Sequence, residues 1–201
     1  MSRWPVAALY VEADGPYADL AAEVYDAERD ARTYTGDLPV VAHPPCGPWG
    51  KLSWSCRHQN PDAGPHAVAE VRRCGGILEH PVGSRLFEHC GILVGDWSWP
   101  WRPTDPWGGY TIRIPQWHWG HRGAKDTILY IVGTADLPPL PARGCVTEPY
   151  PVQNMSSRAR RLTPPAMAWW MAAAAARCTP PRQPASIGSV GESSSCTRRP
   201  P

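Results

Sequence analysis

The stretch from Val40 to Gly50 constrains the fold of this chain more than any other, and it reads Val-Val-Ala-His-Pro-Pro-Cys-Gly-Pro-Trp-Gly. Three apolar residues predict the end of a buried strand, and the two prolines that follow prevent both a longer strand and a helix. The chain must therefore leave the sheet in a rigid turn that carries Cys46 at its tip. Open α/β sheets place ligands and reacting groups at the carboxyl ends of such strands. The alternative is a small apolar Cys46 buried beneath a proline-rich loop.

The composition indicates one domain with long loops. The chain has 201 residues, of which 42% are hydrophobic and 19% are charged, so it is long enough to bury a core. It also holds 25 prolines and 11 tryptophans but one phenylalanine, so short elements joined by ordered loops are expected rather than a helical bundle. We expect the folded domain to span residues 1–178. Residues 179–201 are rich in Pro, Ser and Arg, which predicts a disordered tail.

Charge is unevenly distributed along the chain, although the net charge is only +2. Residues 1–100 hold five more acidic than basic side chains, whereas residues 101–201 hold seven more basic than acidic ones. A basic half that is rich in tryptophan suits an anionic partner that carries bases, such as DNA. The seven cysteines show no framework spacing, and no apolar run is long enough for a signal peptide or a membrane span. We therefore expect reduced thiols in a cytoplasmic protein without membrane contact.

Short apolar runs alternate with helical patterns along the chain. The apolar runs predict strands at residues 6–11, 40–42, 77–81, 110–114 and 127–133, and the helical patterns lie at residues 17–32, 65–74 and 163–177. Alternation of strands and helices indicates an α/β fold with a mainly parallel sheet flanked by helices.

Glu79 is the second candidate catalytic residue. Its apolar run, Ile77–Pro81, ends in polar residues and a proline, as does the run before Cys46. The carboxyl ends of successive parallel strands converge on one cleft, so Cys46 and Glu79 should lie close together. A thiolate can add to C6 of a pyrimidine while a nearby carboxyl group hydrogen-bonds or protonates the ring nitrogen that gains charge. The alternative for Glu79 is a strand-end carboxylate that is held by backbone N–H groups.

Acidic residues follow the first predicted strand. Glu12, Asp14 and Gly15 stand where nucleotide-like cofactors find acceptors for ribose hydroxyls and a close approach to the backbone. A plain acidic turn is the alternative. Histidine and cysteine are frequent, but none forms the C-x-x-C pair of structural zinc sites, and Cys46 lacks the second cysteine of a zinc base deaminase. We therefore expect no metal site.

Two basic segments are candidate contacts to nucleic acid. The segment from Gln116 to Lys125 combines tryptophan with basic and polar side chains, which stack on bases and bind phosphates. Its candidate residues are Gln116, His121, Arg122 and Lys125, and they end a Trp-rich region at residues 97–122 that could serve as an insert for DNA contact. The second segment adds Arg158, Arg160 and Arg161. The alternative is that the tryptophans are core and the charges form a solvated face.

Together these blocks resemble the catalytic domain of DNA cytosine-5 methyltransferases, and most closely the short methyltransferase-like proteins of phages and prophages. Ala42–Cys46 resembles the Pro-Cys nucleophile loop of that family, and Leu78–Pro81 stands in the place of its Glu-Asn-Val block. Further similar blocks are Thr35-Gly36-Asp37 (Gly-Asp), Gln116–Lys125 (Gln-x-Arg-x-Arg) and Arg161–Pro164 (Arg-x-Leu-Thr-Pro). The order and approximate spacing of the blocks match over residues 6–177.

The resemblance implies a Rossmann-like sheet of the class I methyltransferase type and a reaction on DNA. Cys46 would attack C6 of a cytosine extruded from the duplex, and Glu79 would engage N3 and the exocyclic amine. S-adenosylmethionine would bind against Glu12, Asp14, Gly15 and Asp37. Two other functions fit the same residues, namely a thiol-dependent modification of free pyrimidine nucleotides with another carbon donor, and a non-catalytic nucleic-acid-binding relic of such an enzyme.

Overall fold

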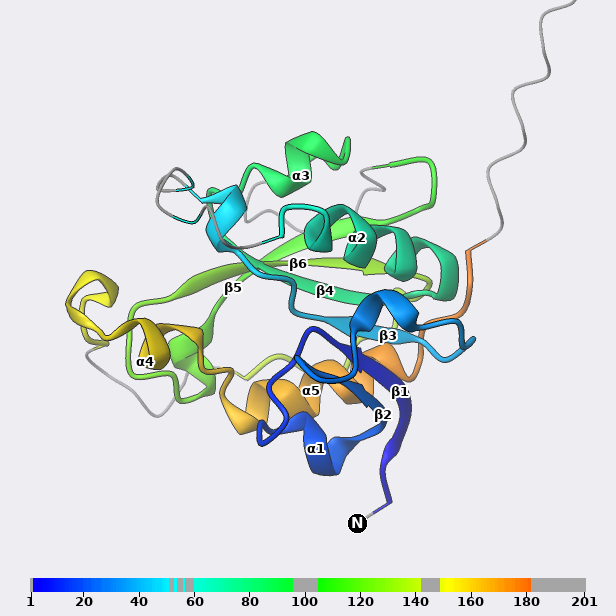
Figure 1. Ribbon diagram of the computed structural model, residues 1–201, viewed down its shortest axis with the longest axis horizontal. Helices are drawn as coiled ribbons and strands as arrows, with labels where there is room; N and C mark the ends of the chain where they lie inside the picture. The colour runs from blue at the N-terminus through cyan, green and yellow to red at the C-terminus, as the bar shows by residue number, and fades with distance from the viewer. Residues whose placement is uncertain are drawn as a thin grey trace, which may run out of the picture.

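The computed structural model describes residues 2–50, 53, 56, 60–95, 105–141 and 149–181. These residues form an α/β domain around a six-stranded sheet that has helices on both faces (Figure 1). The predicted α/β class is therefore confirmed. The predicted tail beyond residue 181 lies outside the described residues, as do Trp97, Trp99 and Trp101 of the Trp-rich region.

The sheet is mixed, with the strand order β2-β1-β3-β4-β6-β5. Its strands are β1 (Trp4–Leu9), β2 (Ala21–Tyr25), β3 (Val40–Ala42), β4 (Gly76–Pro81), β5 (Tyr110–Pro115) and β6 (Asp126–Val132). Strands β2, β1, β3 and β4 pair in parallel, whereas β6 is antiparallel to both of its neighbours, β4 and β5. The expectation of a mainly parallel sheet is thus met in part, because β6 runs antiparallel to both of its neighbours.

Helices cover the two faces of the sheet. Helix α2 (Ala63–Cys74) packs on one face, and α5 (Pro165–Ala175) packs on the other beside α1 (Tyr17–Leu20). The short helices are α3 (Leu86–His89) and α4 (Ser157–Arg161), with 3-10 turns η1 (Ala31–Thr33), η2 (Gly47–Trp49), η4 (Gln116–Trp119) and η5 (Val152–Asn154). The predicted helices at 65–74 and 163–177 correspond to α2 and α5. Within the described ranges, no helix has the length and apolar character needed to cross a membrane.

Successive residues of the central strands enter two different cores. In β1, Val6 packs in the cluster that contains Met167 of α5, while its neighbour Ala7 packs in the cluster that contains Val68 of α2. Both strand residues are fully buried. A strand buried on both faces has no reason to alternate polar and apolar residues, which explains the continuous apolar runs in the sequence.

The helix predicted over residues 17–32 is wrong, because α1 ends at Leu20 and β2 follows it directly, before the 3-10 turn η1. Pairing with β1 and burial of Tyr25 stabilise the extended conformation more than the helical composition disfavours it. The carboxylate of Asp26 then accepts backbone N–H bonds from Glu28 and Arg29, at 2.8 and 2.9 Å. Such local side-chain bonds compete with helix formation and favour a turn.

Gly76 joins α2 to β4 at a position that admits no side chain. Its φ is +138°, and a Cβ added there would overlap the backbone carbonyl oxygen of Val40 in β3. We expect Gly76→Ala to lower the free energy of unfolding by about 3 kcal/mol, measured by urea denaturation. Gly91→Ala is the matched control, because Gly91 also has a positive φ of +67° but faces open space. A control loss of about 1 kcal/mol is expected, and equal losses would contradict the steric reason.

Candidate active site at the carboxyl edge of the sheet

The sheet directions bring most of the predicted site residues to one edge. Strands β1, β3 and β4 are parallel, so the residues that follow them lie at a common edge. Since β6 runs the other way, its first residues lie at this edge too, and β5 ends there. The edge therefore gathers five segments of the chain: Tyr10–Gly15, His43–Cys46, Glu79–Pro81, Gln116 and Lys125–Thr127.

Glu79 is held by three side chains from three other segments. Its Oε1 accepts hydrogen bonds from Gln116 Nε2, at 3.0 Å, and from the hydroxyl of Thr127. Its Oε2 lies 3.3 Å from Nδ1 of His43. The side chain is buried, with the residue only 7% exposed. These contacts replace the backbone N–H groups that the alternative interpretation of Glu79 required.

Glu79 is ionised at neutral pH. Burial by itself raises the pKa of this carboxyl group, but the positive charge of Lys125 and the hydrogen bonds from His43 and Thr127 outweigh burial and lower the pKa. An ionised carboxylate only accepts hydrogen bonds, so Nδ1 of His43 carries a hydrogen. The site thus presents a fixed anion at the end of β4.

Cys46 lies at the start of η2 and is exposed. Exposure argues against the alternative of a thiol buried beneath the proline-rich loop. Desolvation by neighbouring groups and the negative charge of Glu79 raise the pKa of Cys46, while Lys125 acts in the opposite sense. The thiol is therefore neutral at pH 7 in the free protein, and a nucleophilic role requires that bound substrate or Lys125 favours the thiolate.

His43 connects Glu79 to helix α1 through its two ring nitrogens. Its Nε2 lies 2.8 Å from the hydroxyl of Tyr17, which belongs to α1 and is buried. Neither His43 nor Tyr17 was predicted as a site residue. Two signals in the sequence were available, because His43 directly follows the buried strand and Tyr17 is an aromatic residue at the start of a short helix. Thr127 was also missed, although it is a polar residue at the start of an apolar run.

His80 stands where the resemblance expects asparagine, and its environment keeps it neutral. Burial lowers its pKa to about 4, although Glu79 opposes this effect. The ring packs edge-on against Phe87, with the centroids 6.1 Å apart. Its backbone carbonyl oxygen lies 2.9 Å from the Thr127 hydroxyl, whose single hydrogen is shared between this carbonyl and Glu79 Oε1. His80 therefore helps to hold Thr127 beside Glu79, and it adds no charge to the site.

Two of the predicted nucleic-acid contacts are buried, which corrects their assignment. Gln116 is fully buried and bonded to Glu79, so it belongs to the group of side chains that hold this carboxylate. His121 is 5% exposed, with Nδ1 at 3.0 Å from both the backbone N and the carbonyl O of Gly123, so it shapes the loop before β6. A buried side chain cannot meet a phosphate or stack on a base. Arg122 is exposed, and Lys125 is half-buried near Glu79.

The basic segment at residues 158–161 is exposed and forms α4, which the sequence did not predict as a separate helix. Ser156 caps it by accepting a hydrogen bond from the backbone N–H of Ala159 at 3.2 Å. The segment before α4 pairs with the loop before β6. The backbone N–H of Tyr150 donates to the carbonyl oxygen of Arg122, and the backbone N–H of Ala124 donates to the carbonyl oxygen of Tyr150. Figure 1 shows α4 at the same end of the sheet as the loop after β3. The helix that carries Arg158, Arg160 and Arg161 therefore lies at the same end of the sheet as the candidate site.

The predicted cofactor residues do not all share one place. Glu12 and Asp14 are exposed after β1, in a turn that Gly15 closes by donating to the Glu12 carbonyl oxygen at 3.0 Å. Asp37 precedes β3, so it lies at the opposite edge of the sheet, where Arg73 is 3.7 Å away. Its assignment to the same site is wrong, because a residue before a parallel strand and one after it lie at opposite ends. Asp26, which follows β2 beside the end of β1, was missed.

Three carboxylates follow the ends of the adjacent strands β1 and β2. Glu12, Asp14 and Asp26 offer acceptors for ribose hydroxyls or an ammonium group at two adjacent strand ends. Backbone hydrogen bonds to Glu28 and Arg29 lower the pKa of Asp26, so its carboxylate is ionised. As for metals, the described residues contain no group of three His, Cys, Asp or Glu side chains that could hold an ion.

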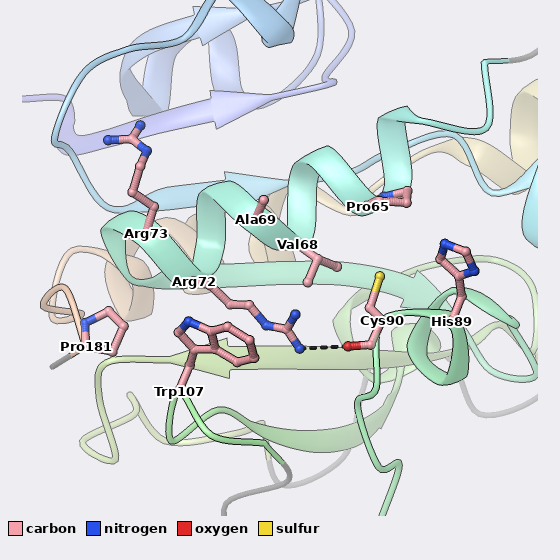
Figure 2. Close-up of a pocket in the computed structure, with 9 residues that line it drawn as sticks. All are labelled: Pro65, Val68, Ala69, Arg72, Arg73, His89, Cys90, Trp107 and Pro181. Atoms are coloured by element: carbon pink, nitrogen blue, oxygen red, sulfur yellow. Dashed lines mark hydrogen bonds between the residues drawn. The ribbon is translucent and has the colours of Figure 1, made fainter. Parts of the chain in front are cut away.

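A second group of residues lines a pocket beside α2 (Figure 2). The guanidinium of Arg72 stacks over the Trp107 ring, 4.0 Å from its centroid, and donates to the Cys90 carbonyl oxygen at 2.9 Å. Arg72 also pairs with Asp105 at 2.9 Å. These bonds occupy the cationic group that lines the pocket, so Arg72 ties the loop around Trp107 to α2.

No protein-family model, curated protein or solved structure matches this chain. The fold and the site therefore define its class by themselves. It is an α/β protein with an exposed thiol and a buried, ionised carboxylate at the carboxyl edge of its sheet.

Proposed function

We propose that this protein is a DNA base-modifying enzyme of the cytosine-5 methyltransferase type. The observation that carries the proposal is the placement of Cys46 and Glu79 at one sheet edge, close enough for the charge of Glu79 to affect the pKa of the thiol. A nucleophile and an ionised acceptor at such an edge match the requirements of a pyrimidine that is attacked at C6. The sequence motifs around both residues point to the same chemistry.

The reaction would begin with addition of the Cys46 thiolate to C6 of cytosine. The electron pair of the C5=C6 bond then extends toward N3 and C5, which makes C5 nucleophilic. Glu79 would accept a hydrogen bond from the exocyclic amine and neutralise the developing charge at N3 through a proton. Gln116 and Thr127 hold the carboxylate in place through Oε1, so Glu79 does not need to reorganise during the reaction.

The strand directions support the finer fold assignment within this proposal. Strands β4 and β5 run in the same direction, because both are antiparallel to β6, which lies between them. One reversed strand inserted between two strands of equal direction is typical of the class I methyltransferase sheet. The same topology fixes Gln116, after β5, and Thr127, in β6, beside Glu79.

S-adenosylmethionine is the donor that the proposal implies, and it would supply a methyl group to C5. Glu12, Asp14 and Asp26 would bind its hydroxyl and ammonium groups at the ends of β1 and β2. The base must leave the duplex to reach Cys46, since C6 is not accessible in a stacked base pair. Arg122, Arg158 and Arg161 are exposed and would bind the phosphates on either side of the extruded base.

Nucleoside mass spectrometry on DNA from cells that express the wild type or Cys46→Ser tests the proposed function. An enlarged cytosine that is present only with the wild type is expected, and its mass would identify the transferred group. Equal nucleoside spectra from soluble proteins would overturn the enzymatic proposal. The raised pKa of Cys46 favours a second candidate in that case, a nucleic-acid-binding protein without catalysis, which would bind DNA equally well with serine at position 46.

Neutralising α4 is expected to weaken DNA binding and to reduce its salt dependence. Each phosphate contact that is lost should lower the slope of log affinity against log salt by about 0.9, so Arg158→Gln with Arg161→Gln should lower it by about 2. Arg177→Gln is the control, because this exposed arginine pairs with Asp136 beyond the far end of β6. Fluorescence anisotropy with a labelled duplex at several salt concentrations measures the slopes. An unchanged slope in the double variant would remove α4 from the interface.

A further inference from the structure

Three side chains that are largely buried form a continuous hydrogen-bonded chain at the proposed site, namely those of Tyr17, His43 and Glu79. Tyr17 contacts His43 Nε2 at 2.8 Å, and His43 Nδ1 contacts Glu79 Oε2 at 3.3 Å. The side chains of His43 and Glu79 are 11% and 9% exposed, and Tyr17 is 2% exposed. The chain thus links α1, the loop after β3 and β4 through groups that water barely reaches.

The hydrogen positions in this chain can be counted. Because the ionised Glu79 only accepts, His43 Nδ1 donates to it. The Tyr17 hydroxyl has one hydrogen and two neighbours, since Met171 Sδ lies 3.6 Å away in addition to His43 Nε2. When the hydroxyl donates to Sδ, Nε2 must carry a hydrogen and His43 is an imidazolium. When the hydroxyl turns to donate to Nε2, His43 is neutral. Rotation of one hydroxyl therefore accommodates both charge states without moving a heavier atom.

We propose that His43 is a positioning residue that supplies, through Glu79, the proton that cytosine N3 takes up when Cys46 adds to C6. This inference rests on the proposed function and adds the source of the proton. Glu79 is a carboxylate in the free site, so it has no proton of its own to give. His43 is the hydrogen-bonded neighbour that can give up its Nδ1 proton, because the neutral ring keeps the hydrogen on Nε2 and donates it to the Tyr17 oxygen, while the Tyr17 hydroxyl donates to Met171 Sδ.

The step balances in atoms and charge. The Cys46 thiolate forms the S–C6 bond, and the electron pair of the C5=C6 bond shifts so that the pair of the C4=N3 bond moves onto N3. N3 takes a proton from the Glu79 carboxyl group, which has received it from His43 Nδ1. A thiolate, a neutral cytosine and an imidazolium therefore become a neutral adduct and a neutral imidazole. The proton that Cys46 released to form the thiolate goes to solvent.

The surroundings of His43 do not exclude either charge state. The titratable and charged groups near it are Tyr17 from α1, Glu79 and His80 from β4, Cys46 on its own loop, and Lys125 before β6. The Glu79 carboxylate attracts a positive charge on His43, whereas the Lys125 ammonium repels it. Bound cytosine that draws a proton from Glu79 would shift the equilibrium between the charged and neutral forms of His43 toward the neutral form.

Exchange of the cytosine C5 hydrogen for deuterium tests this inference without any methyl donor. The C6 adduct makes C5 basic, so it takes deuterium from D2O, and loss of the original hydrogen with expulsion of Cys46 restores cytosine. A duplex with one mismatched cytosine is the probe, because a mispaired base is extruded most readily. Mass spectrometry of the nucleoside gives the exchange rate at each pH.

The wild-type rate is expected to pass through a maximum, because the step needs both the Cys46 thiolate and a proton that can reach cytosine N3 through Glu79. His43→Asn keeps an N–H donor toward Glu79 but cannot titrate, so we expect a rate about 10²- to 10⁴-fold lower that rises with pH without a maximum. His89→Asn is the control, because this exposed histidine packs against Trp49. An unchanged pH profile in His43→Asn would overturn the inference alone. Absence of exchange in the wild type at every pH would overturn the proposed function and the inference with it.

Discussion

Cys46→Ser is expected to abolish covalent capture of cytosine while leaving the fold intact. The thiolate is the only group at the sheet edge to which we assign bond formation with C6, and serine is far less acidic than cysteine, so a loss of about 10³-fold or more is expected. The substituted atom is exposed at the start of η2 and outside both core clusters, so the free energy of unfolding should change by about 1 kcal/mol or less. Intact-protein mass spectrometry with an oligonucleotide that contains 5-fluorocytosine measures the adduct.

Cys90→Ser provides the matched control for this experiment. Cys90 is a partly exposed thiol whose pKa is also raised by burial, but it lies in the pocket beside α2, away from Glu79. We expect this variant to form the adduct as the wild type does. Adduct formation by Cys46→Ser would show that another nucleophile acts, and unfolding of that variant would restore the interpretation of Cys46 as a structural thiol.

The two catalytic candidates could be placed from the sequence because strand direction alone determines their location. Cys46 and Glu79 each follow or end an apolar run, and parallel strands bring such positions to one edge whatever the loops do. Gln116 was selected for its composition and is at the correct edge, but it bonds to Glu79 instead of meeting nucleic acid. Composition shows that a segment is polar, whereas only the packing shows which of its side chains face inward.

Strand direction also explains the failure at Asp37. The motif resemblance placed it with the cofactor, but it lies before β3, and a residue before a strand lies at the edge opposite to one that follows it. The same reasoning would have found Asp26, had residues 17–32 not been predicted as helix. The helical composition of residues 17–32 conceals β2, and with it the position that follows the end of this strand.

The hydrogen bonds of Glu79 could not have been predicted, since its partners come from three other segments of the sequence. Strand β6 is inserted between β4 and β5 and returns the chain to the edge of the sheet that holds Glu79. This arrangement brings Gln116 and Thr127 to Glu79, where they join His43. Tyr17 reaches His43 from α1, whose position depends on packing against α5. The sequence marks such positions by a polar or aromatic residue next to an apolar run, but which of these residues bond to one another depends on tertiary structure.

Glu79→Gln is expected to remove activity and to change how stability depends on pH. The pKa of Glu79 is lowered in the folded protein, so the unfolded chain binds the proton more tightly. The stabilising contribution of Glu79 is therefore complete above its ordinary pKa of 4.5 and decreases as the pH falls below that value. At pH 7 the variant leaves Lys125 without its buried counter-charge, and we expect a loss of about 3 kcal/mol in the free energy of unfolding. Deuterium exchange at cytosine C5 should fall by about 10²-fold or more.

Urea denaturation of wild type and variant at pH 7 and again well below pH 4.5 separates the ionised carboxylate from a neutral one. The difference in unfolding free energy between the two proteins should shrink at the lower pH. Acid reduces the stabilising contribution of the ionised Glu79 carboxylate in the wild type, and the variant lacks that contribution at every pH. Glu70→Gln controls for general charge loss, since Glu70 lies on the outer side of α2 and pairs with Arg73 at 2.5 Å. If the difference for Glu79→Gln stays constant while the protein remains folded, Glu79 is not ionised in the native state. It could then protonate N3 without His43, and the proton source would lie in the carboxyl group itself.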